Sequence, residues 1–208
     1  MSKIVPVYES KFIKVFDIQY AEGKHYLDAT RRNAENIVAA KSAEEFKRML
    51  PDAVSIAAII KVEGEPDRLL LSREYRYPAA QYLLSPPAGL IDAEDVMGDN
   101  PLIVTAKREL LEETGIEAGT QDTFRVINPL LFSTPGMTDE SNALVEAVIV
   151  RDKMPDLSQE GAVGSEKFDG FVLLTKEEAK KVLADGVDDR GIFYSVYTWA
   201  VLMHFVSM

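Results

Sequence analysis

Three glutamates close together on a predicted helix are the residues of this chain best suited to chemistry. Glu109, Glu112 and Glu113 are spaced i, i+3 and i+4, and this spacing places them on one face of an α-helix. Like charges one turn apart repel each other, so the arrangement costs free energy unless a partner neutralises it. Mg²⁺ takes oxygen ligands and keeps open positions for phosphates, which makes it a candidate partner for this face.

The same helix has a simpler interpretation, in which the acidic face is solvated and Arg108 pairs with Glu112 at i, i+4. Taken alone, the helix favours this interpretation, so the rest of the chain must decide between the two. Leu110 and Leu111 are expected to point toward a core, and Gly115 stands where the helix should end.

The composition indicates a globular domain and excludes several kinds of site. The 208 residues are 47% hydrophobic and 27% charged, which suits one well-buried domain. The absence of cysteine excludes disulfides, thiolate zinc sites and a cysteine nucleophile. Because only His25 and His204 are present, we expect neither a Ser-His-Asp triad nor a histidine-rich metal centre. No Walker-type or dinucleotide-binding glycine loop occurs.

The charge and hydropathy of the chain limit the kinds of molecule that it is expected to bind. A formal net charge of −11 disfavours nucleic-acid binding but allows a small anionic substrate, provided that metal ions and arginines line the site. No apolar run is long enough to span a bilayer, and the N-terminus lacks a signal-peptide pattern. We therefore expect a cytoplasmic protein that binds neither membranes nor nucleic acid.

The pattern of the first half of the chain predicts strands, a hairpin and a short helix. Two β-rich runs around a Gly-containing turn predict a β-hairpin within residues 11–32. A capping box at Ser42–Glu45 starts a short helix that ends before Pro51. Residues 78–92 are expected to be mostly loop. Further strands are expected at residues 54–62, 68–75, 124–132, 143–151 and 168–174.

The C-terminal part predicts two helices, and the whole pattern is α+β with helices on both sides of the strands. A second capping box at Thr175–Glu178 starts a helix that stops at Gly186. Residues 192–206 form the last helix. Its residues spaced for burial are Phe193, Val196, Tyr197, Ala200, Val201 and Phe205.

Gly89 and the run Arg108–Ile116 match most of a known motif, G-x5-E-x7-R-E-U-x-E-E-x-G-U. They resemble the second half of the Nudix box, and every fixed position of the nine-residue run fits. Three more segments resemble the ADP-ribose pyrophosphatase branch of that family, namely Arg73–Pro78, Pro87–Asp92 and Thr134–Glu140. The four blocks follow the family's order, so we expect the family's fold and chemistry.

The resemblance implies a Nudix-type α/β/α sandwich with a mixed sheet, plus an N-terminal antiparallel hairpin. Residues 1–50 would form the hairpin and short helix, a dimerisation element that this branch commonly exchanges between two subunits. Residues 51–208 would form the Nudix hydrolase domain. We therefore expect a homodimer, and exposed strand edges also invite pairing.

One departure from the family motif concerns the loop before the helix. The motif leaves thirteen positions between its glycine and its arginine, whereas eighteen residues separate Gly89 from Arg108. Counting back from Arg108 gives Asn100 where the motif has glutamate, and counting forward from Gly89 gives Asp95. Glu94, Asp95 and Asp99 all stay open as the missing carboxylate.

The resemblance implies a set of metal ligands and catalytic residues. Mg²⁺, or Mn²⁺ in its place, would be held by the carbonyl of Ala88 and the carboxylates of Glu109, Glu112, Glu113 and Glu166. Catalysis would depend on Glu113, Glu166 and Arg108. Arg108 would hold one glutamate in its rotamer through a charge-assisted bond, the alternative being a plain surface pair.

The family also draws a glutamate from the loop before the last core strand, as a metal ligand or a water-orienting base. Glu160 and Glu166 are the candidates, and Glu166 fits better because it lies two residues before the predicted strand at Phe168. The residue that does not take this role would be an ordinary solvated charge.

Implied substrate contacts come from three places. Arg76 resembles the arginine that contacts the substrate phosphates. Met137 and Glu140 lie in the segment that reaches the adenosine end, in many relatives across a dimer interface. Tyr20, Tyr26 or Phe16 would stack on adenine, with Arg31 and Arg32 as further contacts, although each aromatic could simply pack in a sheet.

The function that follows is Mg²⁺-dependent hydrolysis of the pyrophosphate bond of ADP-ribose, to AMP and ribose 5-phosphate, or of a related nucleoside diphosphate sugar. The alternative is a catalytically silent module that binds ADP-ribose or another nucleotide, which the altered first half of the motif favours. Retention of Glu109, Glu112, Glu113 and Glu166 argues against the silent module, because it has no chemical need for these carboxylates.

Overall fold

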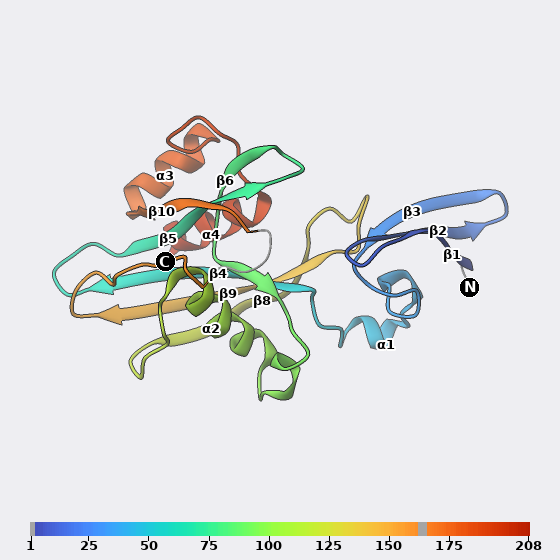
Figure 1. Ribbon diagram of the computed structural model, residues 1–208, viewed down its shortest axis with the longest axis horizontal. Helices are drawn as coiled ribbons and strands as arrows, with labels where there is room; N and C mark the ends of the chain where they lie inside the picture. Colours follow the sequence, from blue (N-terminus) through green and yellow to red (C-terminus); the bar gives the residue numbers. More distant parts are fainter. Residues whose placement is uncertain (1–2, 162–165) are drawn as a thin grey trace. The chain divides into compact units, whose positions relative to one another are not determined.

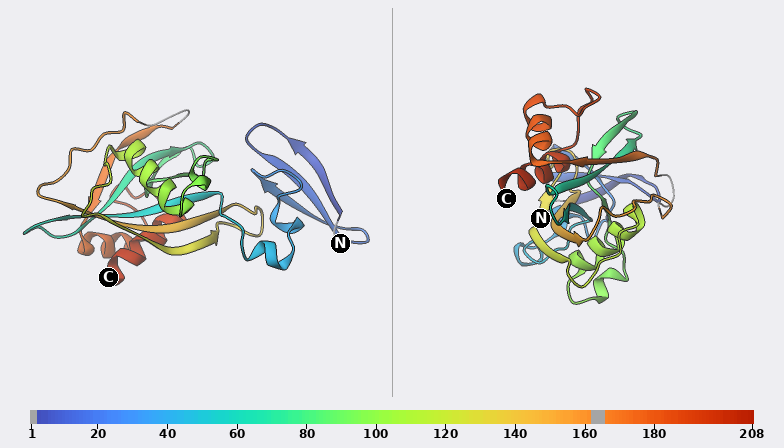
Figure 2. Two further views of the ribbon diagram at one scale, coloured as in Figure 1. Left: turned by 90° about the horizontal axis from the view of Figure 1, so that it is seen from below. Right: turned by 90° about the vertical axis from the view of Figure 1, so that its left-hand side faces the viewer.

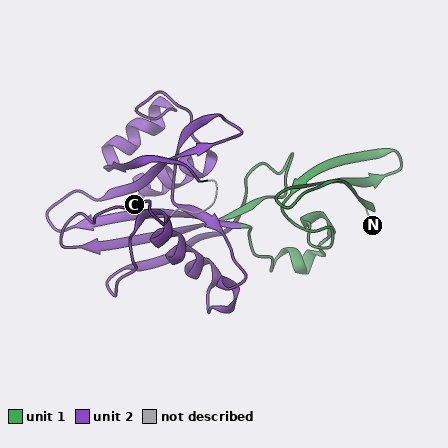
Figure 3. Ribbon diagram, viewed as in Figure 1, with its two compact units in different colours: residues 1–52, 130–142 green, residues 53–129, 143–208 purple. Residues whose placement is uncertain are grey.

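The computed structural model describes residues 3–161 and 166–208, and these contain two separate sheets (Figure 1). The chain divides into two compact units (Figure 3). The first unit takes residues 1–52 together with residues 130–142, and the second takes residues 53–129 and 143–208. Within the described residues, no helix is both long and apolar enough to cross a membrane.

The first unit contains a three-stranded antiparallel sheet in the order β1-β2-β3. The predicted hairpin is confirmed as β2 (Lys14–Ala21) and β3 (Lys24–Thr30), which pair around Gly23 at φ +63°. A third strand, β1 (Lys3–Glu9), was not predicted from the sequence and pairs with β2. This strand contains Pro6, a residue that sheets tolerate on an edge because its missing N–H is not needed there.

Two short helices follow the hairpin. The 3₁₀ helix η1 covers Val38–Ala40, and α1 covers Ala43–Phe46. The predicted capping box is confirmed, because Ser42 accepts from the Glu45 amide and the Glu45 side chain accepts from Ser42. Burial is concentrated elsewhere in the unit, at Phe16 and Ile37, so Phe16 packs in the core and is not free to stack on a base.

The second unit is built on a seven-stranded sheet with the order β10-β5-β4-β9-β8, in which β6 pairs with β5 and β7 pairs with β4. The strands are β4 (Ala53–Val62), β5 (Arg68–Arg76), β6 (Gln81–Ser85), β7 (Ala88–Leu90), β8 (Thr123–Phe132), β9 (Ser141–Arg151) and β10 (Phe168–Leu174). All five strands expected in this region are present. The expected loop at 78–92 was wrong in part, since β6 and β7 lie within it on either side of Pro86 and Pro87.

Helices cover both faces of this sheet, as predicted (Figure 2). Alternation along β4 sends Val54, Ile56, Ala58, Ile60 and Val62 to one face, where they cluster with apolar residues of α2 (Pro101–Thr114). The opposite face is covered by α3 (Lys176–Asp185) and α4 (Val196–Ser207). The α2 helix is therefore held rigidly against the central strand, with one flank left for polar residues.

The helix boundaries follow local capping signals. The α2 helix ends at Gly115, which adopts the left-handed conformation at φ 73°, and α3 ends in the same way at Gly186. The predicted capping box at Thr175 is confirmed. The last helix starts at Val196, capped by Ser195, and not at Ile192 as expected.

The later start of α4 changes which of its residues are buried. Phe193 lies before the helix and is 77% exposed, and Val196 is also exposed, so the prediction that they are buried was wrong. The buried residues of α4 are Thr198, Val201, Leu202 and Phe205. The apolar spacing alone could not identify this face, because α4 is apolar on most sides.

Asp28 is a buried acid in the first unit whose environment disfavours its charge. The side chain lies on β3, and the residue is only 7% exposed. Burial and the neighbouring charge of Asp139 raise its pKa to about 6, against the opposing effects of the Asp139 amide and Arg32. The folded protein therefore binds this proton more tightly than the unfolded chain does.

We expect the stabilisation that comes from protonated Asp28 to be complete below about pH 4 and to be lost as the pH rises through about 6. Asp28→Asn should therefore reduce the loss of unfolding free energy between pH 5 and pH 8 by about 1.4 kcal/mol, the part of the linkage that falls in this pH window. Urea denaturation at both pH values measures this change. Glu22→Gln, in the exposed turn of the same hairpin, is the matched control, and equal pH slopes for Asp28→Asn and wild type would contradict the assignment.

Candidate active site

The buried flank of α2 carries two of the three predicted glutamates. Glu113 is only 5% exposed and Glu109 is similarly buried, whereas Glu112 is partly exposed. The packing of α2 explains this difference. Leu110 is fully buried, and Glu109 and Glu113 lie on the same buried side of the helix. Leu111 is half-exposed, so the expectation that it points into the core was wrong.

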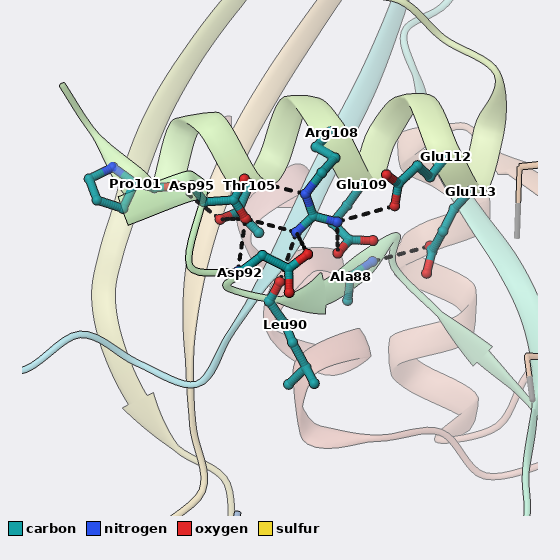
Figure 4. Close-up of polar contacts among 10 residues, drawn as sticks. All are labelled: Ala88, Leu90, Asp92, Asp95, Pro101, Thr105, Arg108, Glu109, Glu112 and Glu113. Atoms are coloured by element: carbon teal, nitrogen blue, oxygen red, sulfur yellow. Dashed lines mark hydrogen bonds and ion pairs between the residues drawn. The ribbon is translucent and has the colours of Figure 1, made fainter. Parts of the chain in front are cut away.

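The short strand β7 lies directly against these carboxylates (Figure 4). The amide of Ala88 donates to Glu113 Oε2 at 3.2 Å. A Cβ atom at Gly89 would lie 1.8 Å from Glu109 Oε1, so only glycine allows the carboxylate to take this position. The match of Gly89 to the motif therefore has a steric cause that the sequence did not reveal.

Arg108 connects the carboxylates to the loop before the helix (Figure 4). Its Nη1 donates to Glu109 at 2.7 Å and to Glu112 at 3.1 Å. Its Nη2 donates to the carbonyl of Leu90 at 2.9 Å and to Asp95 at 2.8 Å. The guanidinium thus fixes two glutamate rotamers at once, which is more than a single surface pair with Glu112 would do.

Asp95 is the carboxylate that pairs with Arg108 from the lengthened loop. It is 3% exposed and also accepts from the Asp92 amide at 3.0 Å and from Thr105 Oγ1 at 2.9 Å. Burial would raise its pKa, but the hydrogen bonds from Arg108, the Asp92 amide and Thr105 hold the pKa below its ordinary value. Glu94 is exposed.

Among the three open candidates, Asp95 is buried against Arg108 whereas Glu94 and Asp99 are exposed, which favours Asp95, the residue reached by counting forward from Gly89. The five additional residues lie between Asp95 and Arg108, where the 3₁₀ helix η2 (Asp95–Met97) and a turn lead into α2. Asp95 and Arg108 are in contact despite this insertion between them.

The carboxylates of the site repel one another. Burial, together with the charges of Glu74, Glu109 and Glu166, raises the pKa of Glu113 to about 9 against the lowering effect of the Ala88 amide. Burial also raises the pKa of Glu109, against the effect of Arg108 and with that of Glu112 and Glu166. Such a cluster is stabilised by a proton or by a cation.

Glu74 is a member of this cluster that the sequence analysis missed. It lies on β5, burial and the charge of Glu166 raise its pKa, and Arg76 Nη2 lies 2.5 Å from its carboxylate and lowers the pKa. The signal available in the sequence was the i, i+2 spacing of Glu74 and Arg76, which places both on one face of a strand.

The two loop glutamates differ in their relation to α2. The charge of Glu166 acts on Glu74, Glu109 and Glu113, whereas Glu160 does not contribute to the shift of any of these. The loop itself docks on the end of α2, because the Ser158 amide donates to Thr114 O at 3.0 Å. The effect of the Glu166 charge on these three side chains supports the prediction that Glu166 is the loop carboxylate, and this assignment stays a prediction.

Metal ligation is not preformed in the described part of the chain, where no set of three or more Asp, Glu, His or Cys side chains converges as a metal site. Arg108 gives a physical reason, since its guanidinium already holds the carboxylates of Glu109 and Glu112. The donors are nonetheless all oxygen atoms, which suits a hard divalent cation, and burial raises the pKa of both Glu109 and Glu113.

The predicted substrate contacts fall in different units. Arg76 belongs to the second unit, where its partly exposed guanidinium pairs with Glu74. Tyr20, Met137 and Glu140 belong to the first unit, and all three reach solvent to some extent. Arg32 is mostly buried and bonded to Asp52 at 2.8 Å, which is a structural role within the first unit.

We expect Asp95→Asn to lower the unfolding free energy by about 2 kcal/mol, because it removes the charge that Arg108 faces and places a donor against the guanidinium. Chemical denaturation at pH 7 measures the change. The matched control is Glu94→Gln, one residue away on the exposed side, which should change stability by less than about 0.5 kcal/mol. Equal stability of the two variants would show that the Asp95–Arg108 contact is dispensable.

Comparison with known proteins places this site in a family. A model of the NUDIX domain matches residues 49–194. The chain is 32% identical to an uncharacterised Nudix hydrolase of Schizosaccharomyces pombe over 102 residues, covering 49% of the chain and 45% of that protein. It is 33% identical to a Nudix hydrolase of Caenorhabditis elegans over 143 residues, covering 68% of the chain and 59% of that protein.

A third relative is the ADP-ribose pyrophosphatase of Saccharomyces cerevisiae, 37% identical over 98 residues, covering 45% of the chain and 37% of that protein. The matches thus span about half the length of these relatives. A crystal structure of an ADP compounds hydrolase superposes with a TM-score of 0.58 at 20% identity, covering 99% of the chain and 94% of that structure. The predicted fold is confirmed, and the chain belongs to the Nudix hydrolase family.

Proposed function

We propose that the protein is a Mg²⁺-dependent hydrolase that splits the pyrophosphate bond of ADP-ribose, or of a related nucleoside diphosphate sugar, into AMP and a sugar phosphate. The observation that carries this proposal is the contact of Glu109 and Glu113 with Gly89 and Ala88. The carboxylates sit on a rigid helix, against a backbone that can supply a further oxygen ligand. This placement is what pyrophosphate chemistry requires of the protein.

The chain's own residues divide the work. Glu109, Glu112, Glu113 and Glu166, with the carbonyl of Ala88, would hold the divalent cations. When bound, the cations polarise phosphoryl oxygens and lower the pKa of a water molecule. Glu166 would orient the attacking water, and Arg108 would keep Glu109 and Glu112 in place.

Two points support ADP-ribose as the substrate. Thr134–Glu140 and Arg73–Pro78 resemble the ADP-ribose pyrophosphatase branch, and the yeast relative named as an ADP-ribose pyrophosphatase is 37% identical over the matched region. Arg76 would contact the phosphates, where a guanidinium can bind two oxygens. Tyr20, Met137 and Glu140 would contact the nucleoside or sugar.

A silent nucleotide-binding module is the second candidate, and one observation favours it, namely that the described carboxylates do not converge on a metal position. The altered motif gives this candidate less support, because the lengthened loop still supplies a buried carboxylate, that of Asp95, which accepts a hydrogen bond from Arg108. The two candidates differ in turnover, so a hydrolysis assay separates them.

Wild-type protein with Mg²⁺ should convert ADP-ribose to AMP and ribose 5-phosphate, and Glu113→Gln should lower kcat at least about 100-fold through loss of a metal-binding charge. Chromatographic detection of AMP is the measurement. Glu117→Gln, on the exposed side after the end of α2, is the control and should retain activity. Tight ADP-ribose binding without AMP release by the wild type would establish the silent module instead.

We also propose a homodimer that forms through the first unit. Its three-stranded sheet exposes Tyr20 and Leu27, the connection between β1 and β2 exposes Phe12, and β1 leaves one backbone edge unpaired by another strand of that sheet. Exposed apolar groups beside a sheet edge favour association with a second copy.

Multi-angle light scattering at micromolar concentration should give about 46 kDa, twice the chain mass of 23.1 kDa. Leu27→Lys should shift the mass toward the monomer because it places a charge on the apolar face. Met97→Lys, at an exposed position of the second unit, should leave the mass unchanged. A monomeric wild type would remove the proposal.

A further inference from the structure

Residues 134–140 connect β8 to β9 in the sequence, yet the hairpin strand β3 holds them. The amide of Ala29 donates to Met137 O at 3.1 Å, and Ala29 forms an isolated parallel bridge with Thr138. The hydroxyl of Tyr26 donates to Gly136 O at 2.7 Å. These contacts fix the backbone of the segment, which we call the 134–140 loop, at three successive residues.

The C-terminal end of the same loop is held by side chains. Asp139 is buried, and its Oδ2 accepts from the Val38 amide at 2.9 Å. Arg31 Nε donates to Glu140 Oε1 at 3.3 Å. The residues that make these bonds all belong to the first unit, so the loop is carried by the N-terminal segment of the chain.

A buried charge network closes the loop at Ser141. Asp52 accepts from the Ser141 amide at 2.9 Å, and Arg32 donates to both Asp52 and Ser141 Oγ. Arg32 also lies 3.7 Å from Asp139. A connecting turn needs no such number of anchors, and their effect is to remove conformational freedom before any ligand arrives.

The anchored loop turns its other side chains outward. Met137 is 63% exposed although its carbonyl is bonded to β3, and the Glu140 carboxylate is partly exposed beside Arg31. A fixed backbone with exposed side chains of different chemistry is the arrangement by which loops on rigid supports recognise ligands.

We propose that Tyr26 and Arg31 are positioning residues that hold the 134–140 loop so that Met137 and Glu140 meet the nucleoside or sugar end of the substrate. This inference rests on the proposed function, which supplies the substrate. It assigns the N-terminal hairpin a part in substrate affinity in addition to its proposed part in association.

Tyr26→Phe removes a single hydroxyl from an exposed position and tests the inference with little risk to folding. The loop then loses one of its anchors and must be ordered in part on binding, so KM for ADP-ribose should rise about 3- to 10-fold while kcat stays within about twofold. Tyr8→Phe, on the exposed edge strand β1 of the same sheet, is the matched control and should change neither constant.

A second readout does not depend on turnover. Hydrogen exchange of the Ala29 amide and of peptides over residues 134–140 should be faster in Tyr26→Phe than in wild type and unchanged in Tyr8→Phe. Arg31→Ala should have the same effect as Tyr26→Phe, and Arg31→Lys should restore part of the protection because it keeps a cation beside Glu140.

The outcomes separate the loop inference from the proposed function. Unchanged exchange in both Tyr26→Phe and Arg31→Ala overturns the inference whatever the activity. Faster exchange with unchanged KM overturns the role in substrate affinity, even if the wild type releases AMP. Should the wild type release no AMP, the proposed function fails, and the Kd of ADP-ribose measured by calorimetry replaces KM in the same comparison.

Discussion

The contact on which the described site depends is the bridge that Arg108 makes between Asp95 and the glutamates of α2. The helix cannot present three carboxylates on adjacent turns without a cation to offset their repulsion, and the guanidinium supplies a permanent one. Asp95 in turn holds the guanidinium from the other side, together with the Leu90 carbonyl. The arginine is thereby fixed between two anionic groups, and the rotamers of Glu109 and Glu112 are fixed with it.

The rest of the second unit holds the residues of this contact in position. The apolar face of α2 packs on β4, so the helix has one orientation, and β7 pairs with β4 and brings Gly89 under Glu109. Both α2 and β7 are thus positioned by contacts with the same central strand, β4. A loop of variable length can then join them, which explains how five extra residues before Arg108 leave the geometry intact.

The predicted site residues are distributed over the two units of the chain. The second unit carries every described carboxylate of the α2 cluster, while the first carries Tyr20, Met137 and Glu140, which are proposed to read the rest of the substrate. Residues 130–142 join the first unit although they comprise the end of β8, the connecting loop and the start of β9. Their buried anchors at Asp139 and Ser141 use Arg32, the Val38 amide and Asp52, which follow the hairpin in the sequence, and this arrangement has no counterpart in local sequence pattern.

The sequence by itself determined the features that depend on neighbours along the chain. These are the acidic face and glycine end of α2, both capping boxes, the hairpin and the five longer strands, because capping and periodicity are local interactions. Tertiary structure decided what depends on distant partners: the pairing of β6 and β7, the burial of Asp95 against Arg108, the approach of Glu74, the buried face of α4 and the attachment of the 134–140 loop. Each of these is a contact between segments far apart in sequence, and no spacing within one segment encodes its partner.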